Sequence, residues 1–182
     1  MTGDDLALVA AASTGDAAAF DALVRRHTAK LYRVALRIVG DPADAEDVVQ
    51  EAWVSAWRSL AQFRGEAAPT TWLYRVVTNA ALAHLRRRKP TVPLEPEGQA
   101  GAALTDAGPT PEQAALRREK VDAALHAISL LEPSQRVPLV LRELEGMSYE
   151  EVAAVLEVSV PALRSRLHRA RVALLAKLEE LR

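Results

Sequence analysis

Residues 148–175 read SYEEVAAVLEVSVPALRSRLHRARVALL, and this stretch predicts two helices joined by a tight turn. Ser148 followed by Glu151 three positions later is the pattern of a capping box, which begins many helices. Ser159 is expected to cap the second helix, with Pro161 tolerated in its first turn. A short helix, a turn and a longer helix form the arrangement that many proteins place in the major groove of DNA.

The second predicted helix has an apolar side and a polar side. Leu163, Leu167 and Ala170 form the inward stripe. The other side carries Arg164, Ser165, His168, Arg169 and Arg171. Guanidinium groups read guanine edges and grip phosphates, so the pattern favours DNA binding. Basic C-terminal helices are also common as solvated surfaces, and this segment alone leaves that interpretation open.

The composition of the 182-residue chain excludes several classes of protein. Because it has no cysteine, it has neither a disulfide framework nor a thiolate metal site. Its first residues, MTGDD, are acidic where a signal peptide needs positive charge, and no apolar run approaches the length of a membrane span. The sequence therefore predicts a soluble cytoplasmic protein of one domain or two small ones.

The net charge of −1 is unevenly distributed. Residues 90–112 carry four acidic and no basic side chains and are rich in proline and glycine. This composition predicts an extended linker between two modules, residues 1–89 and 113–182. Stretched out, the linker would span roughly 70 Å, about two turns of duplex, although a passive tether has the same composition.

Both modules are near neutral, so the free protein is expected to bind DNA weakly.

The N-terminal module has a helical pattern throughout. Asp16 is positioned to cap a helix that Gly40 closes, and Asp41-Pro42 supplies the cap and first residue of the next. A third long helix follows the loop 62–71 and ends in the basic residues 86–89. No β pattern is found, so the predicted fold class is all-α, with two small helical domains.

The helix after Pro42 has an acidic first half. Its carboxylates, with that of the capping residue, are Asp41, Asp44, Glu46, Asp47 and Glu51. They do not form a calcium loop, because Glu46 and Ala52 stand where that loop needs its turn glycine and its bidentate glutamate. An acidic helix face is usually solvated surface, and the alternative is a docking face for a basic partner protein.

The loop 62–71 combines aromatic and cationic side chains. Phe63, Arg64 and Gly65 suit an unstacked base, held by stacking and by hydrogen bonds to its edge. The spacing of Trp72 favours a place in the core over a stacking platform. Residues 86–89 are typical of phosphate contact, although a basic last turn also suits the helix dipole.

Two longer stretches resemble one family. Residues 44–89, DAEDVVQEAWVSAWRSLAQFRGEAAPTTWLYRVVTNAALAHLRRRK, resemble region 2 of the sigma-70 family of transcription initiation factors. Residues 131–175, LEPSQRVPLVLRELEGMSYEEVAAVLEVSVPALRSRLHRARVALL, resemble region 4 of the same family. With only these two regions and a short linker, the chain is similar to the extracytoplasmic-function (ECF) group.

The resemblance implies three protein contacts. Region 2 would bind the β′ clamp helices of core RNA polymerase through Asp47, Gln50 and Glu51. Region 4 would contact the β flap, and the linker would thread toward the RNA exit path. An anti-sigma factor is a common partner in this group, although no motif in this sequence identifies one.

The resemblance also implies two contacts with promoter DNA. Region 2 would capture a melted base of the −10 element with the residues Phe63, Arg64, Gly65, Asn79, Arg86 and Arg87. Region 4 would read the −35 element in the major groove with the residues Arg142, Arg164, Ser165, His168 and Arg169. Of these, Arg142 belongs to the preceding helix and would support the contact.

Several positions depart from the family's usual pattern, among them Thr78, Ala83, Pro161 and Ala162, and two further departures affect the backbone. Glu157 stands in the turn where glycine is frequent, so the turn has to form without glycine's freedom at positive φ. Pro138 lies inside a predicted helix and is expected to kink it or to shift its start.

Other classes of protein fit the sequence less well. The four histidines are scattered, and the sequence has no phosphate-binding loop, nucleophile elbow or zinc-binding histidine pair, so neither catalysis nor any cofactor or metal is expected. The remaining alternative is a helix-turn-helix regulator whose N-terminal module only binds protein. Such a regulator would have no need of an acidic docking helix followed by a base-capturing loop in residues 41–89.

Overall fold

The computed structural model describes residues 2–63, 65, 67–88 and 111–180. Within these residues every regular element is helical, which confirms the all-α fold. The first half contains α1 (Thr2–Ser13), α2 (Ala17–Val39), α3 (Pro42–Ser59), the 3-10 helix η1 (Leu60–Gln62) and α4 (Pro69–Arg87). The second half contains α5 (Pro111–Ser129), α6 (Pro133–Leu139), the π-helical η2 (Val140–Leu144), α7 (Tyr149–Leu156) and α8 (Val160–Glu180). The predicted linker lies outside the described residues, apart from positions 111 and 112, which begin α5.

Side-chain caps set the helix boundaries of the first half as the sequence predicts. Asp16 accepts a hydrogen bond of 3.1 Å from the amide of Ala19, and this bond begins α2. Asp41 accepts one of 3.0 Å from the amide of Asp44 and begins α3. Between them, Gly40 ends α2 with a φ of 81°, a conformation in which glycine is not strained.

Two prolines affect helices in ways that differ from the sequence-based expectation. α4 begins at Pro69, inside the loop expected over residues 62–71, because proline suits the first position of a helix. α6 begins at Pro133 and runs through Pro138, so Pro138 does not shift the helix start. The backbone instead adopts π-helical geometry directly after it, in η2.

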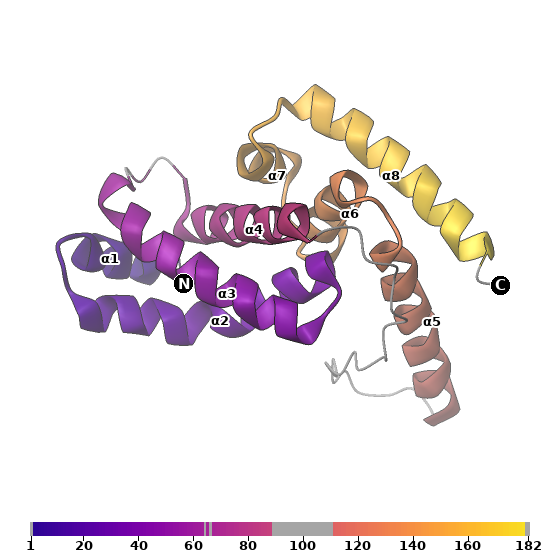
Figure 1. Cartoon of the computed structure of the whole chain (residues 1–182), viewed down its shortest axis with the longest axis horizontal. Helices are drawn as coiled ribbons and strands as arrows, with labels where there is room; N and C mark the ends of the chain where they lie inside the picture. The colour runs from indigo at the N-terminus through magenta and orange to yellow at the C-terminus, as the bar shows by residue number, and fades with distance from the viewer. Residues whose placement is uncertain (1, 64, 66, 89–110, 181–182) are drawn as a thin grey trace.

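α1 to α4 pack around a common core in the first half (Figure 1). Leu23, Val34 and Ile38 of α2 have no exposed surface. Trp53 on α3 is buried too, and its indole Nε1 donates a hydrogen bond of 3.0 Å to the hydroxyl of Thr28. The apolar stripe of α3 thus faces inward, which leaves its acidic side exposed.

The second half is built on α6 and α8. Leu163, Leu167 and Ala170 have no exposed surface, which confirms the predicted inward stripe of α8. α8 packs against α6, whose buried apolar residues include Val137 and Leu139. This packing holds the polar side of α8 toward solvent.

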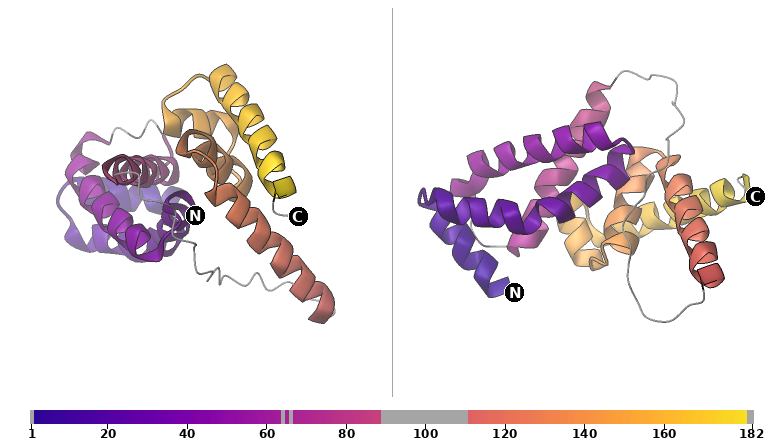
Figure 2. Two further views of the ribbon diagram at one scale, coloured as in Figure 1. Left: turned by 45° about the vertical axis from the view of Figure 1, so that its right-hand side comes forward. Right: turned by 90° about the horizontal axis from the view of Figure 1, so that it is seen from below.

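The two halves are packed against each other (Figures 1 and 2). α7 lies on α4, and α2 contacts α5, α6 and η2. Buried residues of both halves belong to one continuous apolar cluster. The guanidinium of Arg136 reaches across the boundary and donates a hydrogen bond of 2.5 Å to the carbonyl of Ile38. Contacts between the halves therefore combine apolar burial with directed polar bonds.

Candidate nucleic-acid and protein interfaces

The helix-turn-helix unit forms as its sequence predicts. The hydroxyl of Ser148 accepts from the amide of Glu151 at 3.1 Å, and the carboxylate of Glu151 accepts from the amide of Ser148 at 2.8 Å. The capping box of α7 is therefore complete. The hydroxyl of Ser159 accepts a bond of 3.3 Å from the amide of Ala162 at the start of α8.

The turn between α7 and α8 contains an unusual backbone conformation. Glu157 has a φ of 53° and a ψ of 45°, in the left-handed region that favours glycine. Among the described residues it is the one position other than glycine with a positive φ. The amide of Val158 still donates a bond of 3.0 Å to the carbonyl of Ala153, which closes the end of α7.

The residues predicted to read the −35 element lie on the solvent side of the second half. Those on α8 are all exposed: Arg164, Ser165, His168 and Arg169. The hydroxyl of Ser165 donates a bond of 3.2 Å to the carbonyl of Pro161. Arg142 comes from η2 and is partly buried, and its Nη1 donates a bond of 2.8 Å to the carbonyl of Met147.

Tyr149, which sequence reasoning did not single out, brings two of these arginines together. The guanidinium carbon of Arg142 lies 4.9 Å from the centroid of its ring, and that of Arg164 lies 5.4 Å away. The Nη2 of Arg171 is 3.5 Å from the Tyr149 hydroxyl, and this contact lowers the pKa of Tyr149. The sequence contains one signal for this role of Tyr149. An aromatic residue stands at the first position of a helix, and an arginine-rich helix follows.

The predicted polymerase-docking face of α3 is exposed. Asp47, Gln50 and Glu51 all lie on it, beside the exposed apolar side chains of Val54 and Trp57. The two apolar side chains are 49% and 45% exposed, respectively. A stripe with both carboxylates and unburied apolar groups is suited to a partner surface that is basic and partly apolar.

Part of the acidic cluster on α3 is already neutralised by α4. Both carboxylate oxygens of Glu51 accept from Arg87, at 3.1 and 2.6 Å, and this contact lowers the pKa of Glu51. Asp44 pairs with Arg88 and lies 3.2 Å from the Nε2 of His84. Arg87, predicted to contact DNA, is thus held by Glu51, predicted to contact polymerase.

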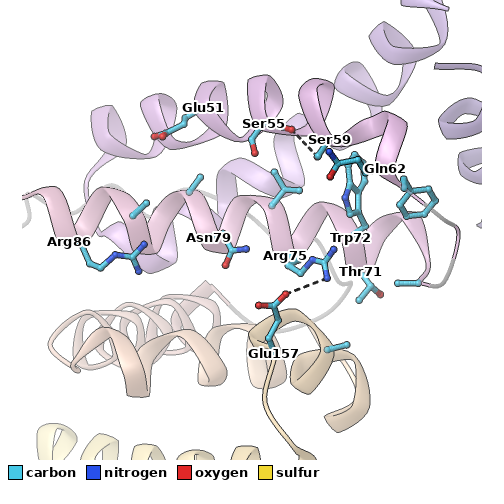
Figure 3. A pocket seen from close by; sticks show the side chains of 16 residues that line it. Glu51, Ser55, Ser59, Gln62, Thr71, Trp72, Arg75, Asn79, Arg86 and Glu157 are labelled. Carbon is cyan, nitrogen blue, oxygen red and sulfur yellow. Dashed lines mark hydrogen bonds and ion pairs between the residues drawn. The ribbon is translucent and has the colours of Figure 1, made fainter. Parts of the chain in front are cut away.

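A groove of about 870 Å³ runs between α3 and α4 (Figure 3). Three of the residues predicted to contact the −10 element line it, namely Phe63, Asn79 and Arg86. The ring of Phe63 packs at 5.3 Å from that of Trp72, which is buried, as its spacing predicts. Aromatic, amide and guanidinium groups along one groove are a combination suited to an unstacked base.

Two other residues predicted to contact the −10 element, Gly65 and Arg87, do not line this groove. Gly65 is exposed in the loop before α4 and has a φ of 72°. Arg87 is paired with Glu51 and is not among the residues that line the groove. Arg64 lies outside the described residues.

The second half contributes one wall of the same groove. Ala154 and Glu157 of the α7 region line it, and a carboxylate oxygen of Glu157 lies 3.7 Å from the Nη1 of Arg75 (Figure 3). Arg75 and Glu157 were not among the predicted binding residues. Nothing local in the sequence marks this ion pair, because its partners are far apart along the chain.

Within the part of the chain that the structure describes, no helix is both long and apolar enough to cross a membrane. The same residues contain no group of three or more His, Cys, Asp or Glu side chains arranged to hold a metal ion.

Comparison with known proteins identifies both halves. The model of the family described as sigma-70 region 2 matches residues 23–91. The model described as sigma-70, region 4, matches residues 122–174. The two regions occur in the predicted order and together include α3, α4 and the helix-turn-helix unit.

Curated relatives match over nearly the full chain. The RNA polymerase sigma-H factor of Pseudomonas aeruginosa is 41% identical, and the alignment covers 93% of this chain and 91% of the relative. The ECF RNA polymerase sigma-E factor of Escherichia coli is 39% identical, with 97% of this chain and 95% of the relative covered.

Solved structures show the same fold. CnrH, solved in complex with the cytosolic domain of CnrY, is 30% identical, with a TM-score of 0.69 and coverage of 97% of this chain and 98% of that chain. The sigma factor RpoE of Bartonella quintana, solved with the anti-sigma factor NepR, matches in fold with a TM-score of 0.64 at 22% identity, over 88% of this chain and 96% of that chain. From these matches and the geometry above, the chain belongs to the sigma-70 family of RNA polymerase sigma factors, in its extracytoplasmic-function group.

Proposed function

We propose that this sigma factor recognises its promoters with the surfaces described above. Its family binds core RNA polymerase and directs it to promoters, and the work is divided here between region 2 in residues 1–89 and region 4 in residues 113–182. Residues 90–112 link the two. The observation that carries the proposal is the groove between α3 and α4, which Phe63, Asn79 and Arg86 line along its length.

Region 4 reads the −35 element with the exposed side of α8. Arg164, Ser165, His168 and Arg169 enter the major groove, and Arg142 supports them from η2. Support comes from the exposure of the four α8 residues and from the buried stripe behind them, which fixes the rotation of the helix. Arginine contacts with base edges supply specificity, and contacts with phosphates supply register.

Region 2 binds the melted −10 element and the polymerase on adjacent faces. Phe63 and Asn79 meet the unstacked base in the groove, Gly65 gives the loop its shape, and Arg64, Arg86 and Arg87 contact the backbone. Asp47, Gln50 and Glu51 dock on the β′ clamp helices, and region 4 meets the β flap. The two faces share α3 and α4, so polymerase and melted DNA are bound side by side.

The protein acts in the cytoplasm and carries out no covalent chemistry. An anti-sigma factor is proposed as its regulator, because RpoE was solved with the anti-sigma factor NepR and CnrH with the cytosolic domain of CnrY. The CnrY domain and NepR are partners of those proteins, and the regulator of this chain is a protein of the same kind.

Run-off transcription with bacterial core polymerase and a pool of genomic fragments tests the proposal. Discrete transcripts that need both components are expected. Arg169→Ala should abolish most transcription while polymerase binding is kept, whereas Arg166→Ala, which removes another exposed arginine of α8, should have a smaller effect. Equal loss of polymerase binding and transcription in Arg169→Ala would refute the role given to Arg169.

A further inference from the structure

The ring of Tyr149 is the meeting point of side chains from three elements. Arg142 comes from η2, Tyr149 from the start of α7 and Arg164 from the first turns of α8. The two guanidinium carbons lie 4.9 and 5.4 Å from the ring centroid, within the range of a cation–π contact. One aromatic ring therefore holds two arginines that are 22 positions apart in the sequence.

The ring of Tyr149 gives the guanidinium of Arg142 a second contact that fixes its orientation. The Nη1 of Arg142 donates to the carbonyl of Met147. Its Nε is buried and has no hydrogen-bond partner among the described residues. With only one directed bond, the planar group needs a second surface to fix its orientation, and the face of Tyr149 lies where that surface is required.

The third cation near the ring is neutralised separately. The Nη2 of Arg171 lies 2.6 Å from a carboxylate oxygen of Glu143 and 3.5 Å from the hydroxyl of Tyr149. At 3.5 Å the contact with the hydroxyl is at the limit for a hydrogen bond, and it is the longer of these two contacts of Arg171. The ring face is the part of Tyr149 over which Arg142 and Arg164 lie.

We propose that Tyr149 is a positioning residue for −35 recognition, whose ring holds Arg142 and Arg164 in the orientation that meets DNA. This inference rests on the proposed assignment of those two arginines to the −35 contact. A flexible arginine loses conformational freedom when it binds, and a ring that restricts it beforehand reduces that loss. The effect should be confined to DNA that carries the correct −35 sequence, since non-specific phosphate contact tolerates mobile arginines.

The test uses holoenzyme assembled from core polymerase and the full chain. The probes are the genomic fragment that gives the strongest run-off transcript and the same fragment with its −35 sequence scrambled. Tyr149→Leu removes the ring but keeps an apolar side chain, and Tyr149→Phe keeps the ring. Tyr149→Leu is expected to weaken binding to the intact fragment by about five- to tenfold and to leave binding to the scrambled fragment unchanged. Tyr149→Phe should behave like the wild-type protein.

A double-mutant cycle separates positioning from folding. If the ring acts through Arg164, then Arg164→Gln should weaken binding to the intact fragment much less in the Tyr149→Leu background than in the wild type. Additive losses would overturn the proposal, since they would indicate a general loss of structure. Arg171→Gln should leave the preference for the intact fragment unchanged.

Three other results would also overturn the positioning role of Tyr149. Tyr149→Phe could lose as much as Tyr149→Leu, which would assign the effect to a hydroxyl contact with DNA. Tyr149→Leu could bind both fragments equally more weakly, or could match the wild type on both. If wild-type holoenzyme itself does not distinguish the two fragments, the proposed −35 assignment fails first, and the inference about Tyr149 fails with it.

Discussion

Tyr74 on α4 donates a hydrogen bond of 2.8 Å to the carboxylate of Glu145, which follows η2 in region 4. The other oxygen of the same carboxylate accepts from Arg37 on α2 at 2.5 Å. The side chain of Glu145 is only 5% exposed. A single buried carboxylate of region 4 is therefore bonded to two helices of region 2, and with the bond from Arg136 to Ile38 it joins the two regions by polar contacts.

Glu145→Gln should loosen this packing. The amide keeps the size of the side chain but removes the negative charge to which Arg37 and Tyr74 donate hydrogen bonds. This change should lower the free energy of unfolding by about 1–3 kcal/mol. Urea unfolding checks the cost, and small-angle scattering should show a larger radius of gyration. Glu143→Gln is the matched control, because Glu143 is exposed and pairs with Arg171 inside region 4. Identical scattering from both variants would contradict this role of Glu145.

The same contact makes stability depend on alkaline pH. Burial, reinforced by the neighbouring Glu145 carboxylate, raises the pKa of Tyr74 well above its usual value near 10. Above pH 10 the unfolded chain releases the proton while the folded protein keeps it, so stability falls as pH rises. The slope should be roughly 1.4 kcal/mol for each pH unit above 10.

Urea unfolding between pH 9 and pH 11 measures this slope, and Tyr74→Phe should remove most of it. Absorbance at alkaline pH offers a second check, because Arg171 lowers the pKa of Tyr149. One tyrosine should therefore ionise early and another only on unfolding. If Tyr74 titrates together with Tyr149 in the folded protein, the environment inferred for Tyr74 is wrong.

Glu157→Gly should stabilise the free protein. The left-handed backbone of Glu157 is strained for any residue with a side chain, and glycine relieves this at some cost in chain entropy. The ion pair with Arg75 is long and exposed, so its loss cancels little of the stability gained by relieving the strain. A net gain of about 0.5–1 kcal/mol is expected in urea unfolding. Glu157→Ala, which loses the ion pair but keeps the strain, should show no gain.

Glu51→Gln should raise the affinity of the free chain for DNA while it weakens polymerase binding. Glu51 holds both nitrogens of Arg87 in a fork, so neutralising Glu51 releases an arginine proposed to contact phosphate. The slope of log affinity against log salt should steepen by about 0.9 for one added phosphate contact. Glu46→Gln makes the same change in net charge at an exposed position, and it should leave the slope unchanged.

The local signals in the sequence predicted local structure well. The capping box at Ser148, the cap at Asp41 and the stripe through Leu163 all form as expected, because each depends on residues within one or two helical turns. The start of α4 at Pro69 was missed, since the loop before it has no strong end signal.

The contacts that join distant segments could not be predicted in this way. Glu145 reads as an ordinary surface glutamate, and only packing brings it to Tyr74, 71 positions away. Glu51 and Arg87 were both predicted to bind partners, but their mutual pairing depends on how α3 and α4 align. Tyr149 is a similar case, because its importance comes from arginines on two other elements.

If the groove between α3 and α4 binds the melted base as proposed, the packing of α7 on α4 would limit how much of the free protein can initiate transcription. Ala154 and Glu157 form one wall of that groove, so a base that needs more room than this wall leaves would enter only after the contact is given up. The apparent affinity of the protein for a promoter would then be multiplied by the fraction of molecules that are open, and each ~1.4 kcal/mol of packing reduces that fraction about tenfold. Substitutions at this boundary would therefore set how much transcription a given amount of protein supports, while the surfaces for polymerase and DNA stay intact.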